Sequence, residues 1–246
     1  GLIPARMLSA TETSWTPHPM ATEYVVPPPS QPAVNVNGTT AMFPVRRIFC
    51  MIGNYPSSHR PAPLGDRTPS VFTKPADAIV PDGATVHCTG ATTSLHHEVE
   101  LVAAIGRSAR AVDPQRASAC IFGFAVGVDL GRRDLIEFAK RDGLPWDAGK
   151  AFDLSAPVGD IQRADGFDPT RGRIRLDVNG DTRQDADIAD MLQDAATVVA
   201  RISQLFKLVP GDLVFTGSPA GGRELLPGDT VQASIQGLEP LRFHVM

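Results

Sequence analysis

The sequence predicts an α+β domain that is mainly β. Short β-prone runs recur along most of the 246 residues, and turn signals such as Asn179-Gly180 and Pro210-Gly211-Asp212 separate them. One long stretch has the apolar period of an amphipathic helix. Strands and helices do not alternate regularly along the chain, which argues against a doubly wound parallel sheet.

An irregular N-terminal extension is expected over residues 1–44. The segment is dense in Ser, Thr and Pro, and the run Pro27-Pro28-Pro29 excludes both a helix and a central strand. Met20 is a candidate native start, in which case residues 1–19 are not native to the protein. Residues 45–246 remain for one β-rich domain, for which about 200–250 residues is an ordinary size.

The expected strands are rich in β-branched and apolar residues and end at Gly, Pro or polar turns. Ile174, Leu176 and Val178 alternate with charged residues before Asn179-Gly180, which predicts a half-exposed strand of a hairpin. The other expected strands cover residues 45–52, 95–106, 121–130, 213–216 and 230–235.

One long helix and a few short ones complete the expected fold. Residues 132–141 have the polar and apolar spacing of a short helix. Asp187 can cap a longer helix that runs to about Phe206 and carries an apolar stripe. Such a stripe predicts that the long helix packs on the sheet.

Charge and hydropathy exclude several classes of partner. The formal net charge is −4, the pI is near 5.9 and basic residues are dispersed, so no nucleic acid is expected. No apolar run reaches the roughly 20 residues that span a bilayer, and no secretory signal is evident, so no membrane partner is expected. Three cysteines without CxxC spacing suggest neither disulfides nor structural zinc. These features predict a soluble cytoplasmic protein.

A pair of carboxylates gives the first indication of chemistry. Glu98 and Glu100 lie two residues apart in an expected strand and so share one face of it, among apolar neighbours. Burying such charges costs several kcal/mol unless a cation compensates. Asp129, at the end of another apolar run, is a third candidate ligand. Oxygen ligands select Mg²⁺, Mn²⁺ or Ca²⁺, although a solvated strand face is the alternative interpretation of the pair by itself.

Four sequence blocks follow one another in the order and spacing of a known family. They are LHHEVELVAAIG (95–106), GFAVGVDLGRRDL (123–135), GKAFDLSAPVG (149–159) and GDLVFTGSPAG (211–221). The series resembles the fumarylacetoacetate hydrolase family, and the match covers most of residues 43–245. Within the family the sequence is most similar to the fumarylpyruvate hydrolases, metal-dependent enzymes of aromatic catabolism.

The resemblance implies a fold, a cofactor and an assembly. It implies that residues 45–246 are a catalytic domain with a mixed β-sandwich roll, which usually forms a homodimer. It also implies that Glu98, Glu100 and Asp129 hold Mg²⁺ or Mn²⁺, which Ca²⁺ could replace in vitro.

The same resemblance assigns candidate residues to a small oxo-acid substrate. It places Arg133 and Lys150 beside the metal, where each would neutralise charge on the substrate. The segment TGSPAG is similar to the loop that binds the substrate carboxylate, which points to Thr216 and Ser218. Lys74 is a further candidate cation of the pocket, with packing at a strand end as the alternative.

The reaction implied is hydrolysis of a carbon–carbon bond in a 2,4-dioxo acid, an acylpyruvate such as fumarylpyruvate, with release of pyruvate. Lys150 would stabilise the enolate that develops, and His59 is the candidate base that activates water. Family members commonly pair that histidine with a glutamate three residues later, but Ala62 stands at this position. Pro61 and Pro63 also oppose the short helix that would present such a pair.

Two further departures from the family pattern lie near the expected substrate. Ile136 stands where a substrate-binding glutamine is common, and His97 replaces a frequent tyrosine. Because these departures spare the metal ligands, two alternatives stay open. One is a metal-dependent decarboxylase or enol–keto tautomerase of a small oxo-dicarboxylic acid, and the other is a non-catalytic relative that binds metal and ligand.

Overall fold

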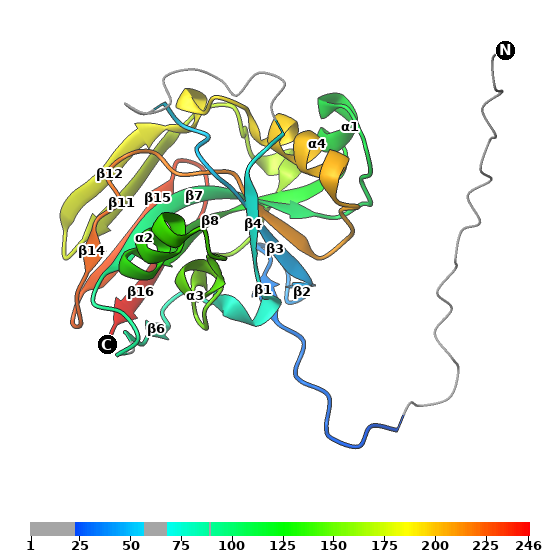
Figure 1. Cartoon of the computed structure of the whole chain (residues 1–246). Helices are drawn as coiled ribbons and strands as arrows, with labels where there is room; N and C mark the ends of the chain where they lie inside the picture. The colour runs from blue at the N-terminus through cyan, green and yellow to red at the C-terminus, as the bar shows by residue number, and fades with distance from the viewer. Residues whose placement is uncertain (1–22, 57–67, 89) are drawn as a thin grey trace, which may run out of the picture. The chain divides into compact units, whose positions relative to one another are not determined.

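In the computed structural model, which describes residues 23–56, 68–88 and 90–246, two long antiparallel strands form the centre of the fold (Figure 1). They are β7 (Leu95–Ile105) and β8 (Ile121–Arg132), and almost all of their residues are buried. Their register places Glu98 opposite Asp129 and Glu100 opposite Gly127. The β-branched and apolar composition of both strands suits burial on both faces.

The sheet built around this pair has the strand order β10-β8-β7-β13-β3-β4. Strand β13 lies parallel to β3, while the other neighbours on this path are antiparallel, so the sheet is mixed. A short strand, β14, pairs with β7 beyond the end of β13. The added strands are β3 (Arg47–Met51), β4 (Val71–Lys74), β10 (Gln162–Arg163), β13 (Asp212–Phe215) and β14 (Glu224–Leu225).

A second sheet packs against the first, with the order β12-β11-β15-β16-β6. Its strands are β6 (Thr85–Val86), β11 (Arg173–Val178), β12 (Asp181–Asp187), β15 (Thr230–Ile235) and β16 (Leu241–Val245). The main hydrophobic core joins Val99 and Leu101 of β7 to Leu176 and Phe243 of this sheet. Since side chains alternate along a strand, Glu98 and Glu100 face away from that core.

The opposite face of β7 is covered over part of its length by a second apolar cluster. Val102 of β7 and Phe215 of β13 pack there with Val34 and Phe43, which belong to the hairpin of β1 (Ala33–Asn35) and β2 (Met42–Pro44). This hairpin lies inside the segment that the sequence predicts to be irregular, so the ordered part begins before residue 45. A parallel pair, β5 (Ile79–Val80) and β9 (Ala156–Pro157), borders the same cluster.

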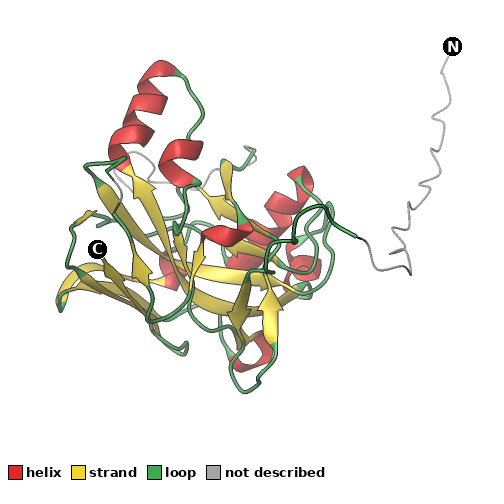
Figure 2. Ribbon diagram, turned by 90° about the horizontal axis from the view of Figure 1, so that it is seen from below, coloured by secondary structure: helices red, strands yellow, loops and turns green. Residues whose placement is uncertain are grey.

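Most of the helices lie at the margins of the strand layers (Figure 2). The α-helices are α1 (Pro114–Ser118), α2 (Arg133–Asp142), α3 (Asp147–Lys150) and α4 (Ala195–Leu205), and the 3₁₀ turns are η1 (Ala76–Ala78), η2 (Ala164–Gly166) and η3 (Ile188–Asp190). None of the helices in the described part of the chain has the length and apolar character needed to span a bilayer. The predicted α+β, mainly β class is confirmed.

The long helix expected from Asp187 to Phe206 is wrong in its first turns. Asp187 caps η3, and α4 begins after a second cap, Asp194, whose carboxylate accepts a hydrogen bond from Thr197 N at 2.7 Å. Leu192 and Gln193 instead donate their backbone N–H groups to Asn54. The helix cannot continue through them because these groups are already bonded to another segment.

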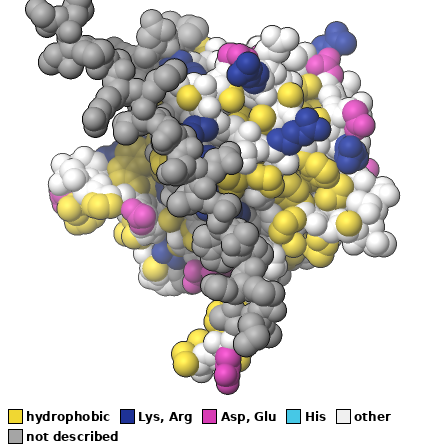
Figure 3. All heavy atoms as spheres, turned by 90° about the vertical axis from the view of Figure 1, so that its right-hand side faces the viewer, with side chains coloured by type: hydrophobic (Ala, Val, Ile, Leu, Met, Phe, Trp, Pro, Cys, Tyr) yellow, Lys and Arg dark blue, Asp and Glu magenta, His cyan; other side chains and the backbone are white. Residues whose placement is uncertain are grey.

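The face shown in Figure 3 carries Lys and Arg side chains dispersed among hydrophobic ones, as far as the described residues form it. Near the end of α4, Phe206 is partly exposed and its ring lies 5.1 Å from that of Phe49. The Arg47 guanidinium stacks over the same Phe49 ring at 4.9 Å. The contact between the Phe206 and Phe49 rings holds the end of α4 against the sheet.

Replacing the cap of α4 should affect stability without affecting the site. Asp194→Ala leaves the Thr197 N–H without its acceptor, so we expect the free energy of unfolding to fall by about 1 kcal/mol. Urea denaturation followed by circular dichroism measures this difference. Asp181→Ala, at an exposed aspartate on β12, is the matched control and should stay within about 0.5 kcal/mol of the wild type. Equal loss in both variants would contradict the capping role.

Candidate metal centre

Three carboxylates from the two central strands meet at one point. Glu98 and Glu100 on β7 and Asp129 on β8 each offer an oxygen, and these oxygens all lie within 4.8 Å of one another. Glu100 and Asp129 are buried, whereas the Glu98 side chain is 45% exposed and lines a cavity. The register of β7 against β8, together with the alternation of side chains, therefore brings together the three ligands that the sequence proposes.

Two lysines supply positive charge to this cluster. The Lys150 ammonium, on α3, lies 2.8 Å from Glu98 Oε2 and 2.6 Å from Asp129 Oδ2. Lys74, on β4, lies 2.8 Å from Asp129 Oδ1 and donates to the carbonyl oxygens of Leu130 and Lys150. Lys74 is thus a buried residue that holds Asp129 and the backbone of α3. Its ammonium is buried, bonds to these three partners and does not line the cavity.

Gly217 provides the closest backbone contact to the carboxylates. Its N–H donates to Glu100 Oε2 at 2.6 Å, with φ at +104°. A Cβ atom at this position would come within 2.7 Å of Asn54 Cβ. Glycine is therefore required here for two reasons, the left-handed backbone and the close approach of Asn54.

Burial separates the pKa values of two of the carboxyls. Desolvation raises the pKa of Glu100 well above its ordinary value, and the charges of Asp129 and Glu98 raise it further. Desolvation also acts on Asp129, but the ammonium groups of Lys150 and Lys74 outweigh it and keep its pKa below the ordinary value. Glu100 is therefore the carboxyl that most lacks a compensating cation.

The cluster fits a hard divalent cation. Its donors are carboxylate oxygens, which are the ligands that Mg²⁺, Mn²⁺ and Ca²⁺ prefer. The three carboxylates outnumber the two ammonium groups, so a dication would reverse the sign of the local charge and favour an anionic ligand. It would also remove the electrostatic penalty on ionised Glu100.

A cavity of about 750 Å³ opens beside the carboxylates. Arg133 lines its mouth on α2, where the guanidinium is exposed and pairs with Glu137 at 2.9 Å. Ser218, on the loop that follows β13, also lines the cavity, and its hydroxyl accepts a hydrogen bond from Gln184 Nε2 at 2.9 Å. Ile136 lies on the wall, where the family pattern usually has a polar side chain.

Thr216 does not take the place that the sequence assigns to it. It is fully buried, it is not part of the cavity wall, and its hydroxyl donates to the Leu101 carbonyl oxygen at 2.8 Å. The residue continues the pairing of β13 with β7 and supports the loop from below. We therefore correct its role from substrate contact to support of the loop.

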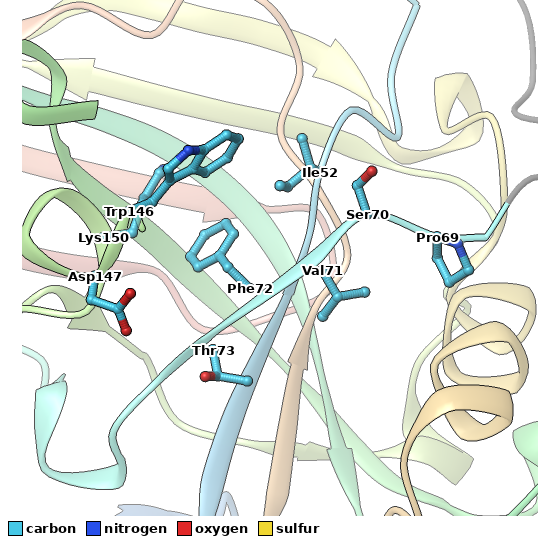
Figure 4. A pocket seen from close by; sticks show the side chains of 9 residues that line it. All are labelled: Ile52, Pro69, Ser70, Val71, Phe72, Thr73, Trp146, Asp147 and Lys150. Atoms are coloured by element: carbon cyan, nitrogen blue, oxygen red, sulfur yellow. The ribbon is translucent and has the colours of Figure 1, made fainter. Parts of the chain in front are cut away.

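A side compartment of about 520 Å³ adjoins the cavity and shares Ile52, Phe72, Trp146 and Lys150 with it (Figure 4). Figure 4 shows Trp146 and Lys150 at one end and Pro69 at the other. The Lys150 ammonium lies 5.2 Å from the centre of the Phe72 ring. Aromatic rings therefore border the cluster on the side where Lys150 lies.

The histidines are placed differently from each other. His59 lies outside the described residues. His97 faces the core between the sheets, where Nδ1 bonds Gln184 Oε1 at 2.9 Å and burial lowers its pKa to about 4. Tyr55 lines the cavity with a buried hydroxyl that has no hydrogen-bond partner among the described residues. Nothing in the sequence singled out Tyr55 or Gln184, because their value depends on neighbours distant in the chain.

Residues 47–246, most of the chain, match the family model described as fumarylacetoacetate (FAA) hydrolase C-terminal. The chain belongs to the fumarylacetoacetate hydrolase family. It is therefore an enzyme, and its carboxylate cluster stands on the strands that carry two of the family's sequence blocks.

Individual members of the family resemble the chain over most of its length. The fumarylpyruvate hydrolase of a Ralstonia species is 34% identical over 71% of this chain and 91% of its own length. The mitochondrial oxaloacetate tautomerase of Pongo abelii is 33% identical over 81% of this chain and 91% of its own length. The crystal structure of Pseudomonas aeruginosa fumarylpyruvate hydrolase, in complex with Mn²⁺ and pyruvate, superimposes with a TM-score of 0.86 at 36% identity, covering 91% of this chain and 99% of that one.

The raised pKa of Glu100 gives a pH dependence to metal binding. Glu100 keeps its proton to a higher pH than an ordinary glutamate, and a cation must displace that proton. We expect the affinity for Mn²⁺ to rise by up to about tenfold per pH unit below the Glu100 pKa and to level off above it. Electron paramagnetic resonance of free Mn²⁺ between pH 5.5 and 8 measures this affinity.

Glu100→Gln is the matched variant, because it keeps the shape and removes the ionisable group. Its Mn²⁺ affinity should be much lower and nearly independent of pH over the same range. A wild-type affinity that does not change with pH would contradict the assignment of Glu100, provided that circular dichroism shows a folded protein throughout.

Proposed function

We propose that this enzyme hydrolyses the carbon–carbon bond of an acylpyruvate, a 2,4-dioxo acid such as fumarylpyruvate, and releases pyruvate. The observation that carries the proposal is the oxygen-donor cluster with Lys150 on its edge, in a chain similar to a fumarylpyruvate hydrolase that binds Mn²⁺ and pyruvate. Glu98, Glu100 and Asp129 would hold Mn²⁺ or Mg²⁺. The cation, when bound, would polarise the carboxylate and 2-oxo oxygens of the substrate.

The bonds that form and break in this hydrolysis define what the protein must supply. Water adds to the distal carbonyl carbon, the bond between that carbon and the methylene carbon breaks, and the acyl part leaves as a carboxylic acid. The electron pair of the broken bond passes to the pyruvate part as an enolate, which then takes up a proton. The protein must therefore deprotonate water and stabilise the enolate oxygen.

Lys150 suits the second task, the stabilisation of the enolate oxygen. Desolvation by itself lowers its pKa, but Asp129 and Glu98 outweigh this and raise the pKa above its usual range. The side chain thus stays an ammonium at neutral pH, positioned to stabilise an oxyanion near Glu98 and Asp129.

The other polar groups of the cavity can recognise the anionic substrate. Arg133 can contact a carboxylate at the mouth, because its guanidinium is exposed and its Glu137 partner is also on the surface. Ser218 adds a hydroxyl beside the carboxylates, on a loop whose Gly217 N–H is already bonded to Glu100. We propose His59 as the base on the strength of the sequence, since an ordinary imidazole titrates near neutral pH.

Tautomerisation of an oxo-dicarboxylic acid such as oxaloacetate is the second candidate reaction. Two observations favour it: the similarity to an oxaloacetate tautomerase, and the absence of a glutamate three residues after His59. Exchange between enol and keto forms needs a stabilised enolate but no activated water. The cluster and Lys150 would serve either reaction.

Rates on two substrates separate these reactions. We expect the Mn²⁺-loaded protein to release pyruvate from an acylpyruvate, detected by coupling to lactate dehydrogenase. His59→Ala should reduce that rate by about 10² to 10⁴, the usual worth of a positioned base, and Glu98→Gln should abolish it. Rapid enol–keto exchange of oxaloacetate without acylpyruvate cleavage, unchanged in His59→Ala, would overturn the hydrolase proposal in favour of the tautomerase.

We also propose that the enzyme is a homodimer, as members of this family usually are and as twofold assemblies are common in general. Light scattering coupled to gel filtration should give twice the chain mass at micromolar concentration. A monomer mass under these conditions would refute the assembly without bearing on the reaction.

A further inference from the structure

The stretch of β7 that carries the metal-binding carboxylates lies beside a gap in the sheet. On the edge of β7 away from β8, β13 pairs as far as Val102, and β14 begins its pairing at His96. Between these points, on this edge of β7, no described strand pairs with the stretch that holds Glu98 and Glu100. The chain instead leaves β13 at Phe215, crosses as the loop 216–223, and returns at β14.

One buried side chain from the other sheet bridges this gap. Gln184, on β12 and 1% exposed, accepts a hydrogen bond from Val99 N at 3.0 Å. Its Oε1 also lies 2.9 Å from His97 Nδ1. On its other end, Nε2 donates to Ser218 Oγ at 2.9 Å and to the Pro219 carbonyl oxygen at 2.8 Å. The amide oxygen thus takes part in two hydrogen bonds and the amide nitrogen donates two, which uses the full hydrogen-bonding capacity of the side chain.

The network fixes the orientation of its members. Val99 N can only donate and the Pro219 carbonyl can only accept, so the Gln184 amide has one acceptable orientation. His97 must then donate from Nδ1 to Gln184 Oε1. Val99 lies between Glu98 and Glu100, so this amide takes the place of a strand neighbour at the centre of the metal-binding stretch.

Tight backbone packing leaves the loop little freedom to move away. A Cβ on Gly221 would lie 2.5 Å from the Arg183 carbonyl oxygen and 3.3 Å from Gln184 Cγ. A Cβ on Gly222 would lie 2.7 Å from the His97 carbonyl oxygen. The loop is thus pressed against both β12 and β7 where Gln184 joins them.

We propose that Gln184 is a positioning residue that holds the Glu98–Glu100 stretch of β7 in register with the loop 216–223. One amide thereby fixes the metal ligands and the Ser218 side of the cavity together. The proposal rests on the proposed function in that it takes the carboxylates to be metal ligands. Metal sites depend on such supporting contacts because the ligands themselves are held only through the backbone that carries them.

Gln184→Met tests the proposal, because methionine has a similar length and cannot form these hydrogen bonds. We expect the Mn²⁺ dissociation constant, measured by electron paramagnetic resonance without substrate, to rise by about 10- to 100-fold. We also expect the spectrum of bound Mn²⁺ to broaden as its ligands become less ordered. The matched control is Gln232→Met, at a half-buried position on β15, which should leave both measurements unchanged.

A folded Gln184→Met protein that binds Mn²⁺ within threefold of the wild type would overturn the proposal, even if its melting temperature falls. If Gln184→Met does not fold, Gln184→Asn is measured in its place. It keeps a buried amide but is one methylene too short to reach both sides, so we expect Mn²⁺ binding at least threefold weaker, and an unchanged constant overturns the proposal. Failure of the wild type to bind Mn²⁺ would refute the metal centre itself and the role of Gln184 with it.

Discussion

The ion-pair cluster around Asp129 is the interaction on which the rest of the site depends. This carboxylate is fully buried in the central pair of strands, where an unpaired charge would be strongly destabilising. Lys74 from β4 and Lys150 from α3 meet it from two sides, with Nζ to oxygen distances of 2.8 and 2.6 Å. Because Lys74 also binds the Lys150 carbonyl, the same charge fixes the position of α3 and of its ammonium.

The pairing of β7 with β8 places the two glutamates beside the buried Asp129 charge. Glu98 lies directly opposite Asp129, and Glu100 follows on the same face. A slip of the register by one residue would turn both glutamates into the core and would turn Val99 and Leu101 out of it. The extensive apolar pairing of β7 with β8 excludes that slip, so the stability of the core and the geometry of the cluster have a common origin.

Much of this arrangement could be predicted from the sequence. The strands near residues 47–51, 121–132, 173–178 and 230–235 follow from β-branched runs and turn signals, and α2 from its spacing. The order of the family blocks pointed to the three clustered carboxylates and to Lys150 beside them. Errors arose where a distant segment competes for backbone groups: Asn54 takes the N–H groups of Leu192 and Gln193, so the expected long helix is divided.

The sequence by itself determined the mainly β class, the family and the chemical types of the site residues, because periodicity and motif order are local properties of the chain. Only the tertiary structure decided which of these residues face the cavity. Thr216 turned out to bond the Leu101 carbonyl and Lys74 to lie beneath Asp129. Gln184 reaches β7 and the loop at Ser218, which are distant from it in the chain. The physical reason is that the direction of a polar side chain is set by the partner that satisfies its hydrogen bonds or charge, and for these residues that partner is far away in sequence.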